Sequence, residues 1–492
     1  MNFNWIDKRP FYQWVLLILL IALCLRLPNI GRDSLWLDES ISYLASQLPV
    51  QQIFNNSVQS SHPPMYYFFL KLWGTAVPDS DSTLRGLGVL WSLLLIPLIA
   101  QFSKDLFRNK KLALLTALLV AISPFHILYS HELRMYTQVM FFVTLGTWAY
   151  WQARHSSDWR WWLLFGIGFG TAVYTHLFAN LALFAVNLHA LLETDRRKIF
   201  PTVFGISVGL AILFLPWGLS IFAESEQELG SLRPLNQEYF RNPIKPLTSI
   251  AFLLFGISSS FAISGTAFFI ALSFILILLL EVRRLHQEGV PSGVKLILLQ
   301  IGFVLGVPLV VYTIRPFFLP ERTMAAASPA LLLLLTWVVT RNKSPLPYLT
   351  AVSALLMFVS TASYHFGDPL KPPYQEATTY VVDSLQANDL VLHTSDGSYL
   401  PALRYAELPN HLLLAGDPDP RKPIEVYELV GGDVVAAEEV LDRNGRLWVI
   451  VALEHSLEWQ QAQSDFFAAQ FRLLESQNIG GIDIFLYEDA GN

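Results

Sequence analysis

The stretch at residues 11–30, FYQWVLLILLIALCLRLPNI, decides the fold of this chain. As a helix it is about 30 Å long, which matches the hydrocarbon thickness of a bilayer. Its only charged side chain is Arg26, near the end of the run. No small-residue cleavage site follows before Pro28, so the run predicts an uncleaved first transmembrane helix and not a signal peptide.

The composition predicts a membrane protein with many helices. Of the 492 residues, 53% are hydrophobic and only 15% are charged, and the mean hydropathy is +0.42. Such values are typical of a polytopic membrane protein. The formal net charge is −6, and the acidic residues concentrate after residue 364, so nucleic acid is not expected as a partner. Cys24, the single cysteine, excludes an intramolecular disulfide and is interpreted as a packing residue.

Hydropathy over windows of about 19 residues predicts about eleven transmembrane helices. The expected spans are 11–29, 84–102, 112–128, 136–153, 160–175, 177–192, 199–221, 263–280, 295–314, 323–340 and 346–363. The apolar segment 246–261 is interrupted by three serines, and we expect a re-entrant or interfacial helix there. The chain is thus predicted to be multi-pass in the cell's inner (plasma) membrane, in contact with membrane lipids.

Basic residues predict the orientation. One set of loops carries more lysines and arginines than the opposite set, and the positive-inside rule makes these loops cytoplasmic. They are Lys8, Arg9, Lys104, Arg108, Lys110, Lys111, Arg154, Arg160, Arg196, Arg197, Lys198, Arg283, Arg284, Lys295, Arg341 and Lys343. The opposite loops hold the polar motifs. We therefore expect the chemistry on the non-cytoplasmic side.

The chain changes character after residue 363. Residues 1–363 are predicted to form the transmembrane domain with its outer loops, and residues 364–492 a small soluble α/β domain on the periplasmic or extracellular side. The breaker-rich stretch 368–373 is interpreted as a linker. Helices are expected at 376–385 and 456–471, and strands at 389–394, 446–453 and 481–487. No glycine-rich phosphate loop follows any of these strands.

Two adjacent carboxylates, Asp38 and Glu39, follow the first span. A solvated surface pair is the plain alternative, but carboxylates close to a bilayer are costly and indicate a function. We expect an amphipathic helix at 41–48, lying on the membrane with Trp36 and Tyr43 as interfacial anchors. A partly desolvated carboxylate there suits a general base, and its neighbour suits a divalent cation.

Three further clusters occur in the same set of loops. His62-Pro63-Pro64 keeps His62 out of regular helix, which indicates either a rigid turn or a ligand of phosphate or metal. The stretch 131–136 carries Glu132, Arg134 and Tyr136, as a helix-start charge pair or as a ligand site. Residues 315–322 place Arg315 and Arg322 in a proline-limited loop. Arginine suits phosphate because its planar fork offers several donors.

The order of these motifs resembles the glycosyltransferase C superfamily. More narrowly, residues 10 to 345 are similar to family 39 and Rgt-type enzymes, including protein O-mannosyltransferases and the lipid A aminoarabinose transferase. The motifs are an Asp-Glu pair in the first outer loop, His-Pro-Pro-x-Tyr-Tyr before the second span, Arg-x-Tyr after the third and Leu-Pro-Glu-Arg before a leucine-rich span. The resemblance implies an inverting transferase that moves a hexose or pentose from a polyprenyl phosphate to an outer-face acceptor during cell envelope biogenesis.

The resemblance also implies roles for single residues. Asp38 would deprotonate the acceptor, and Glu39 would assist it or bind a cation. His62 would lie close by, so Asp38, Glu39 and His62 are the predicted ligands of a divalent metal ion. Arg134, Tyr136 and Arg322 would hold the donor phosphate, with Glu132 and Arg315 as further substrate-binding residues. The sequence does not identify the acceptor.

Two rival functions remain open on the sequence. A transporter or flippase of lipid-linked sugars would also need many helices and intramembrane charges, but paired broken helices or an inverted repeat are not evident. A membrane-anchored binding protein would use its C-terminal domain, which carries no ligand motif. We expect that domain to shape acceptor choice or stability, so that a chain ending near Asp368 keeps some transfer.

Overall fold

The structure is a computed structural model of the whole chain. It describes residues 10–59, 62–229, 289–314, 324–341, 346–406, 411–414, 433–435, 445–452 and 465–489, with isolated positions between 251 and 288 and at 440. The chain divides into two compact units. The helical unit comprises 1–30, 85–220 and 232–368, and the sheet unit comprises 31–84, 221–231 and 369–492. The segment 31–84, assigned from sequence to the membrane domain, thus packs with the C-terminal residues.

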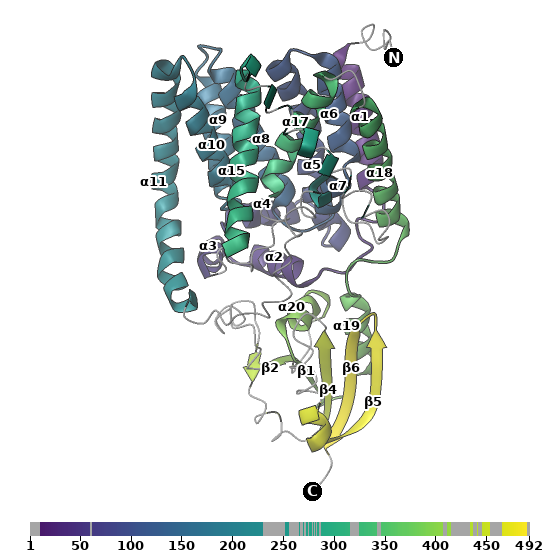
Figure 1. The fold of residues 1–492 in the computed structure, drawn as a ribbon. Helices are drawn as coiled ribbons and strands as arrows, with labels where there is room; N and C mark the ends of the chain where they lie inside the picture. The colour runs from purple at the N-terminus through teal and green to yellow at the C-terminus, as the bar shows by residue number, and fades with distance from the viewer. Residues whose placement is uncertain are drawn as a thin grey trace. The chain divides into compact units, whose positions relative to one another are not determined.

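The helical unit consists of helices that lie side by side (Figure 1). They are α1 (Phe11–Arg26), α5 (Asp81–Phe107), α6 (Lys110–Ile122), α7 (Pro124–Ser130), α8 (Tyr136–Ala153), α9 (Arg160–Val173), α10 (Ala179–Leu192), α11 (Arg196–Leu229), α15 (Ser292–Ile314), the 3-10 turn η1 (Ala325–Ala327), α17 (Ser328–Arg341) and α18 (Leu346–Phe366). These helices overlap the expected spans from 11–29 to 199–221 and from 295–314 to 346–363. The expected helices at 246–261 and 263–280 lie largely outside the described residues.

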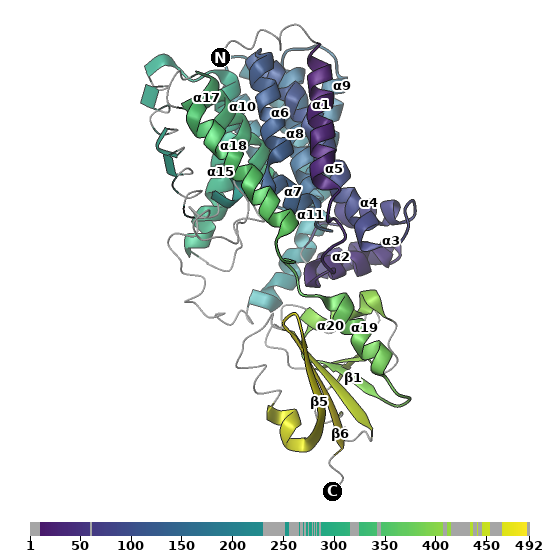
Figure 2. The same cartoon turned by 90° about the vertical axis from the view of Figure 1, so that its right-hand side faces the viewer.

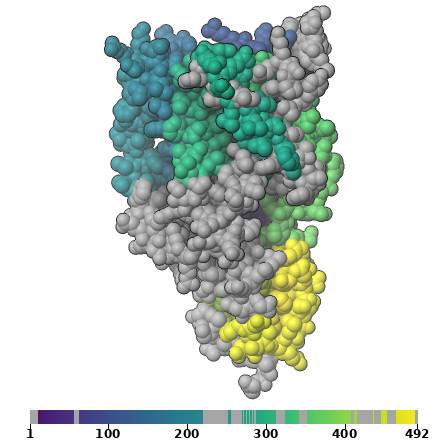
Figure 3. All heavy atoms as spheres, viewed as in Figure 1, coloured from purple at the N-terminus to yellow at the C-terminus, as the bar shows by residue number. Residues whose placement is uncertain are grey.

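Several of these helices can cross a membrane. Among the described residues, Asp81–Phe107, Arg196–Leu219 and Ser292–Val311 are long and apolar enough alone, and α6 with α7 forms a fourth, bent candidate. Helix α11 has an apolar surface, as a membrane span requires. Ile212 and Leu213 are each 64% exposed, and the α11 atoms lie on the surface of the helical unit (Figure 3). Exposed leucine and isoleucine suit contact with lipid. The count of about eleven spans stays a prediction.

The predicted span 112–128 is broken into two helices. Helices α6 and α7 meet at an angle of 52°, because Pro124 lacks an N–H group and starts a new helix as its first residue. The buried Arg26 guanidinium compensates the break by donating to the carbonyls of Ala121 at 2.7 Å and Val120 at 3.2 Å. The one charge in the first apolar run therefore satisfies backbone acceptors inside the bundle.

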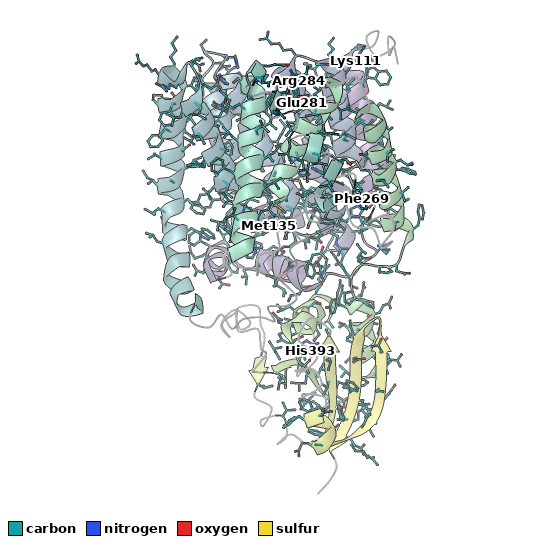
Figure 4. The ribbon with its side chains drawn as sticks, viewed as in Figure 1. Lys111, Met135, Phe269, Glu281, Arg284 and His393 are labelled. Atoms are coloured by element: carbon teal, nitrogen blue, oxygen red, sulfur yellow. The ribbon has the colours of Figure 1, made fainter. Side chains whose placement is uncertain are left out.

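The two ends of the helical unit differ in charge. Basic side chains gather at one end, where Arg154 and Lys295 pair with Glu193 at 2.7 and 3.0 Å. Lys111 and Arg284 lie at this end in Figure 4, and Met135 lies toward the other. Met135, at the end of the loop 131–135, thus lies away from the labelled basic residues.

The sheet unit combines three helices of the first outer segment and two C-terminal helices with a mixed sheet. The helices are α2 (Leu37–Gln47), α3 (Val50–Gln59), α4 (Met65–Gly74), α19 (Tyr374–Ser384) and α20 (Asp396–Tyr405), and the strands are β1 (Leu390–His393), β2 (His411–Leu414), β3 (Asp433–Val435), β4 (Arg446–Ala452), β5 (Phe471–Ile479) and β6 (Ile482–Asp489). The strand order is β3-β2-β1-β4-β6-β5. Strands β1 to β4 pair in parallel, and β6 pairs antiparallel to β4 and β5.

Alternate side chains of the strands build two cores. Leu390 and Leu392 of β1 belong to one core and Val391 to the other, as the two-residue period of a strand requires. The second core is covered by α19 and by α20, which are seen beside the sheet in Figure 2. The predicted strands at 389–394, 446–453 and 481–487 coincide with β1, β4 and β6. The predicted helix at 456–471 lies partly outside the described residues, and β5 begins at Phe471.

Candidate active site

The predicted site residues belong to both units. The sheet unit carries Asp38, Glu39 and His62, and the helical unit carries Glu132, Arg134 and Tyr136. Arg315 and Arg322 lie outside the described residues. The structure therefore shows the local geometry of two groups of residues, one in each unit.

The acid pair lies inside a helix and not ahead of one. Trp36 is the extended N-cap of α2, and the helix begins at Leu37, so Asp38 and Glu39 occupy its first turn. This corrects the expectation of a helix at 41–48 that begins after the pair. Carboxylates in a first turn are favoured because the helix dipole places partial positive charge there. The backbone of the first turn thus fixes the positions of both acids.

The two carboxylates have different surroundings. Neighbouring residues of an α-helix point about 100° apart. Glu39 is completely buried, and its Oε2 accepts a hydrogen bond from Lys371 Nζ at 2.8 Å. Asp38 is partly exposed, and its backbone carbonyl accepts from Ser42 Oγ at 3.0 Å. Of the pair, Asp38 is the partly exposed residue, and Glu39 is the buried one, held by Lys371.

Helix α2 packs on the C-terminal part of the chain. Its apolar side chains contact the core around α20 and β2 through Leu37, Ile41 and Leu44 against Tyr399, Leu400 and Leu413. The apolar face that predicted a helix on the membrane surface is thus turned toward α20. An amphipathic pattern alone does not distinguish a lipid surface from a protein surface, because both bury the same apolar stripe.

The two aromatic residues expected at the membrane interface make contacts within the sheet unit. The Trp36 ring packs against the sheet core and lies 5.7 Å from Lys371 Nζ. The Tyr43 hydroxyl donates to Asp79 at 3.0 Å, and its ring lies 4.3 Å from the Arg404 guanidinium. Both aromatic side chains therefore help to fix α2 by cation–π contacts.

Both ends of the first outer segment are fastened to α20. Arg404 forms ion pairs with Asp79 at 3.0 Å and with Asp81 at 3.2 Å. The hydroxyl of Tyr405 donates to Asp81 and accepts from the Leu35 amide at 2.6 Å. Five residues outside the motifs thus hold the ends of the segment in which the acid pair lies.

His62 lies just before α4 in irregular backbone. The N-cap of α4 is Pro64, so His62 is two residues ahead of the cap. Its side chain is partly exposed, while Tyr66 and Tyr67 behind it are buried with ring centroids 5.9 Å apart. The prolines thus keep His62 out of regular helix, as expected, and its role as a ligand stays a prediction.

In the helical unit, His131 anchors the loop 131–135. Its Nε2 lies 2.7 Å from the Arg26 carbonyl, and its Nδ1 lies 2.9 Å from the Tyr364 hydroxyl. Burial lowers the pKa of His131 to about 3, although the bond to the Arg26 carbonyl acts in the opposite direction. The ring is therefore neutral, with the Nε2–H donating and Nδ1 accepting. It connects the loop to α1 and α18 and supplies no positive charge.

A glycine of α5 lets the same loop approach closely. A Cβ at Gly88 would lie 2.7 Å from the Ser130 carbonyl oxygen and 3.3 Å from that of Glu132. Any larger residue would push the loop away. The Glu132 side chain is partly exposed.

Arg134 and Tyr136 are both buried at the start of α8, with exposed fractions of 4% and 3%. The Tyr136 ring packs edge-to-face on Tyr129 with centroids 4.7 Å apart, and it lies 6.5 Å from the His176 ring. A guanidinium held inside a membrane bundle is costly, which is typical of a functional position. Arg85 of α5, which the motifs did not indicate, is likewise buried and donates to the Ile30 carbonyl at 3.1 Å.

The predicted metal ligands do not gather around one point. Over the part of the chain that the structure describes, no three His, Cys, Asp or Glu side chains are grouped to hold an ion. Glu39 instead has the Lys371 ammonium at 2.8 Å. This arrangement does not fit a divalent cation on Asp38, Glu39 and His62, and the metal requirement stays a prediction.

The sequence reasoning missed Lys371 and Arg404. Lys371 lies in the stretch interpreted as a linker, and Arg404 in a domain expected to be separate, 332 and 323 residues from their carboxylate partners Glu39 and Asp81. The sequence did offer one signal for Lys371. It lies among three prolines, which restrict the backbone of this stretch.

Comparison with known proteins supports the motif analysis. Residues 61–219 match the family model described as dolichyl-phosphate-mannose-protein mannosyltransferase. This region contains His62 and the loop 131–135. No functionally curated protein matches the sequence.

Solved structures share the fold along almost the whole chain. ArnT from Cupriavidus metallidurans, solved in the apo state and bound to undecaprenyl phosphate, gives a TM-score of 0.62 at 11% identity, covering 96% of this chain and 98% of that one. The archaeal oligosaccharyltransferase AglB from Archaeoglobus fulgidus, in complex with an inhibitory peptide and a dolichol-phosphate, gives 0.50 at 12% identity, covering 99% and 75%. The family match and the shared fold confirm the resemblance to the glycosyltransferase C superfamily.

Proposed function

We propose that this chain is an integral-membrane glycosyltransferase that moves a sugar from a polyprenyl-phosphate donor to an acceptor on the non-cytoplasmic face. The proposal depends on one observation. In a chain with this fold, the two acids of the pair have different surroundings. Glu39 is locked by Lys371, while Asp38 on the same helical turn stays partly exposed. A fixed and reachable carboxylate is what an acceptor hydroxyl or amine needs as its base.

The charge of the helical unit supports the side of the membrane. The basic loops meet at one end, and the loop 131–135 lies toward the other. The chain leaves the helical unit after Ile30 and returns at Arg85, and these two residues are joined at 3.1 Å. Ile30 follows α1, whose Arg26 carbonyl contacts His131. The segment with the acid pair therefore begins and ends at the less basic end, which the positive-inside rule makes non-cytoplasmic.

The reaction that fits these groups is a single displacement at the anomeric carbon. The acceptor hydroxyl or amine forms a bond to that carbon as the bond to the phosphate oxygen breaks, so configuration inverts. The acceptor proton passes to the Asp38 carboxylate. The bonding electrons leave with the polyprenyl phosphate, and Arg134 with Tyr136 stabilises its growing negative charge. A buried cation is more effective there than one in water, because the local dielectric constant is low.

The other predicted substrate residues have supporting parts in this proposal. His62, Glu132, Arg315 and Arg322 are assigned to the donor and acceptor groups around these two centres. Experiment decides whether the transferred sugar is a hexose or a pentose, and whether the acceptor is a glycan, a lipid or a protein. We assign the C-terminal residues, together with the acid pair, to the periplasmic or extracellular side.

The test combines cells with purified protein. Mass spectrometry of a deletion strain should show accumulation of one polyprenyl-phosphate sugar and loss of that sugar from a surface glycan. Purified wild-type protein should then convert the same donor, drawn from a panel of undecaprenyl-phosphate-linked hexoses and pentoses, to undecaprenyl phosphate. Asp383→Asn, an exposed acid of α19, serves as the matched control. Donor that crosses vesicles without being cleaved would instead identify a flippase.

A further inference from the structure

The Glu39–Lys371 ion pair joins the first outer segment to the stretch that follows α18. Lys371 Nζ lies 2.8 Å from Glu39 Oε2, and the side chains are only 13% and 0% exposed. Most surface ion pairs contribute little because water screens them. This pair lies out of water, where a carboxylate needs a compensating cation to stay ionised.

The backbone around Lys371 is also fixed. The Leu370 amide donates to Asp33 Oδ2 at 3.3 Å, and the Gln375 amide donates to Ser34 Oγ at 3.1 Å. Prolines at positions 369, 372 and 373 restrict the chain on both sides. The stretch expected to be a linker is therefore fixed against residues 33–34, immediately before α2.

These contacts act on the acid pair through the helix. Glu39 is in the first turn of α2, so the Lys371 bond restrains that turn. Asp38 is the preceding residue on the same turn and moves with it. Asp33, which accepts from the Leu370 amide, also pairs with Arg32 at 2.9 Å. A small error in the direction of a base is costly, because proton transfer needs a separation close to that of a hydrogen bond.

We propose that Lys371 is a positioning residue for sugar transfer, which orients the Asp38 carboxylate by holding Glu39. The inference rests on the proposed function, in which Asp38 accepts the proton. It gives the C-terminal part of the chain a role in the chemistry. A chain that ends at Asp368 lacks Lys371, so we now expect it to lose transfer, in contrast to the expectation from sequence.

The experiment compares kcat and KM for Lys371→Met, Lys371→Arg and the control Arg472→Met. Arg472 is an exposed cation of the same unit, paired with Glu488 across β5 and β6. Rates are measured at saturating undecaprenyl-phosphate-linked sugar, using the donor that the wild-type protein consumes. We expect Lys371→Met to lower kcat at least tenfold with KM changed less than threefold. Lys371→Arg should recover most of the rate, and Arg472→Met should match the wild type.

A second variant covers the case in which Lys371→Met does not fold. Glu39→Gln/Lys371→Met removes both buried charges together, which is often tolerated where removing one is not. It should fold and be as slow as Glu39→Gln alone, because in this proposal Lys371 orients Asp38 through Glu39. A folded Lys371→Met protein, or a double variant, with wild-type kcat would overturn the proposal while leaving the proposed function intact. A wild-type protein that cleaves no donor would overturn both.

Discussion

At the scale of single residues, the sequence predicts candidate reactive side chains but not the residues that hold them in place. Asp38, Glu39, Arg134 and Tyr136 were predicted because charges beside a membrane are costly and stand out. Lys371 was not predicted, because its partner Glu39 is 332 positions away and neither belongs to a periodic pattern. The partner of a long-range ion pair is not marked in a single sequence, even where, as at Lys371, flanking prolines show that the backbone is restricted. Candidate reacting residues are thus easier to predict from sequence than the residues that position them.

Arg134 gives the first prediction. Arg134→Ala should weaken use of the donor because a charged hydrogen bond to phosphate is worth about 1.5–3 kcal/mol. That corresponds to roughly ten-fold to over a hundred-fold in kcat/KM. Titration of the purified protein with undecaprenyl phosphate measures the binding part directly. Arg160→Ala, an exposed arginine at the start of α9, should bind as the wild type does. Equal affinity and turnover in both variants would make Arg134 a structural residue.

At the scale of helices and strands, apolar length predicts where a span lies but not whether it is continuous. The expected span 112–128 is α6 and α7 with a bend of 52° between them. Pro124 was visible in the sequence, but the partner that makes the break tolerable is Arg26, from a different helix. Similarly, the amphipathic pattern of α2 gave a helix, and only the packing on α20 shows which surface it covers.

The α6–α7 break gives the second prediction. Arg26→Leu should destabilise the helical unit, because two buried backbone carbonyls and the Ser92 hydroxyl lose their donor. Each unpaired buried acceptor costs about 1–3 kcal/mol. Thermal unfolding of the protein in detergent, followed by aggregation, should begin at a clearly lower temperature than for the wild type. Cys24→Ala, two residues away on the same helix, is the control. An unchanged unfolding temperature for Arg26→Leu would show that the α6–α7 break does not need the Arg26 hydrogen bonds.

Two buried histidines of the sheet unit give the third prediction. The ring centroids of His393 and His411 lie 4.2 Å apart, and Figure 4 labels His393 within the sheet unit. Burial lowers the pKa of His393 well below its usual value, and it lowers the pKa of His411 to about 4. Both are neutral in the folded state, whereas the unfolded chain takes up protons below pH 6.5. Stability should therefore fall as the pH drops from 6.5 toward 4, by about 1.4 kcal/mol per pH unit for each histidine.

Hydrogen exchange measured by mass spectrometry checks this dependence. Amides of β1 and β2 in the full-length protein should lose protection between pH 7 and pH 5, after correction for the intrinsic exchange rate. His411→Phe should reduce the loss because one of the two protonation sites is removed. Protection that is equal at both pH values would mean that the histidines do not titrate on unfolding.

At the scale of the whole molecule, the sequence separates membrane from soluble residues but not the units that pack together. Hydropathy placed the boundary at residue 363, close to the division after Asp368. It assigned residues 31–84 to the membrane part because they lie between two spans. In the structure, Leu37, Arg404 and Lys371 are among the contacts that join this segment to the C-terminal residues. Position along the chain carries no information about such contacts.

Topology gives the fourth prediction. Alkaline phosphatase fused after residue 380 should be active, because the basic loops place the opposite end of the bundle outside the cytoplasm. The same fusion after Lys198 should be inactive, and a cytoplasmic reporter should give the reverse pattern at both sites. An inactive phosphatase at residue 380 would place the acid pair and the C-terminal residues on the cytoplasmic side.

The central claim is that Asp38 takes the proton in a sugar transfer, and one rate measurement tests it most directly. Asp38→Asn keeps the shape of the side chain and removes its charge. The account predicts that turnover of the undecaprenyl-phosphate-linked donor falls by about 10² to 10⁴, while undecaprenyl phosphate binding and the Asp383→Asn control stay at wild-type values. A folded Asp38→Asn protein with wild-type turnover would contradict the account.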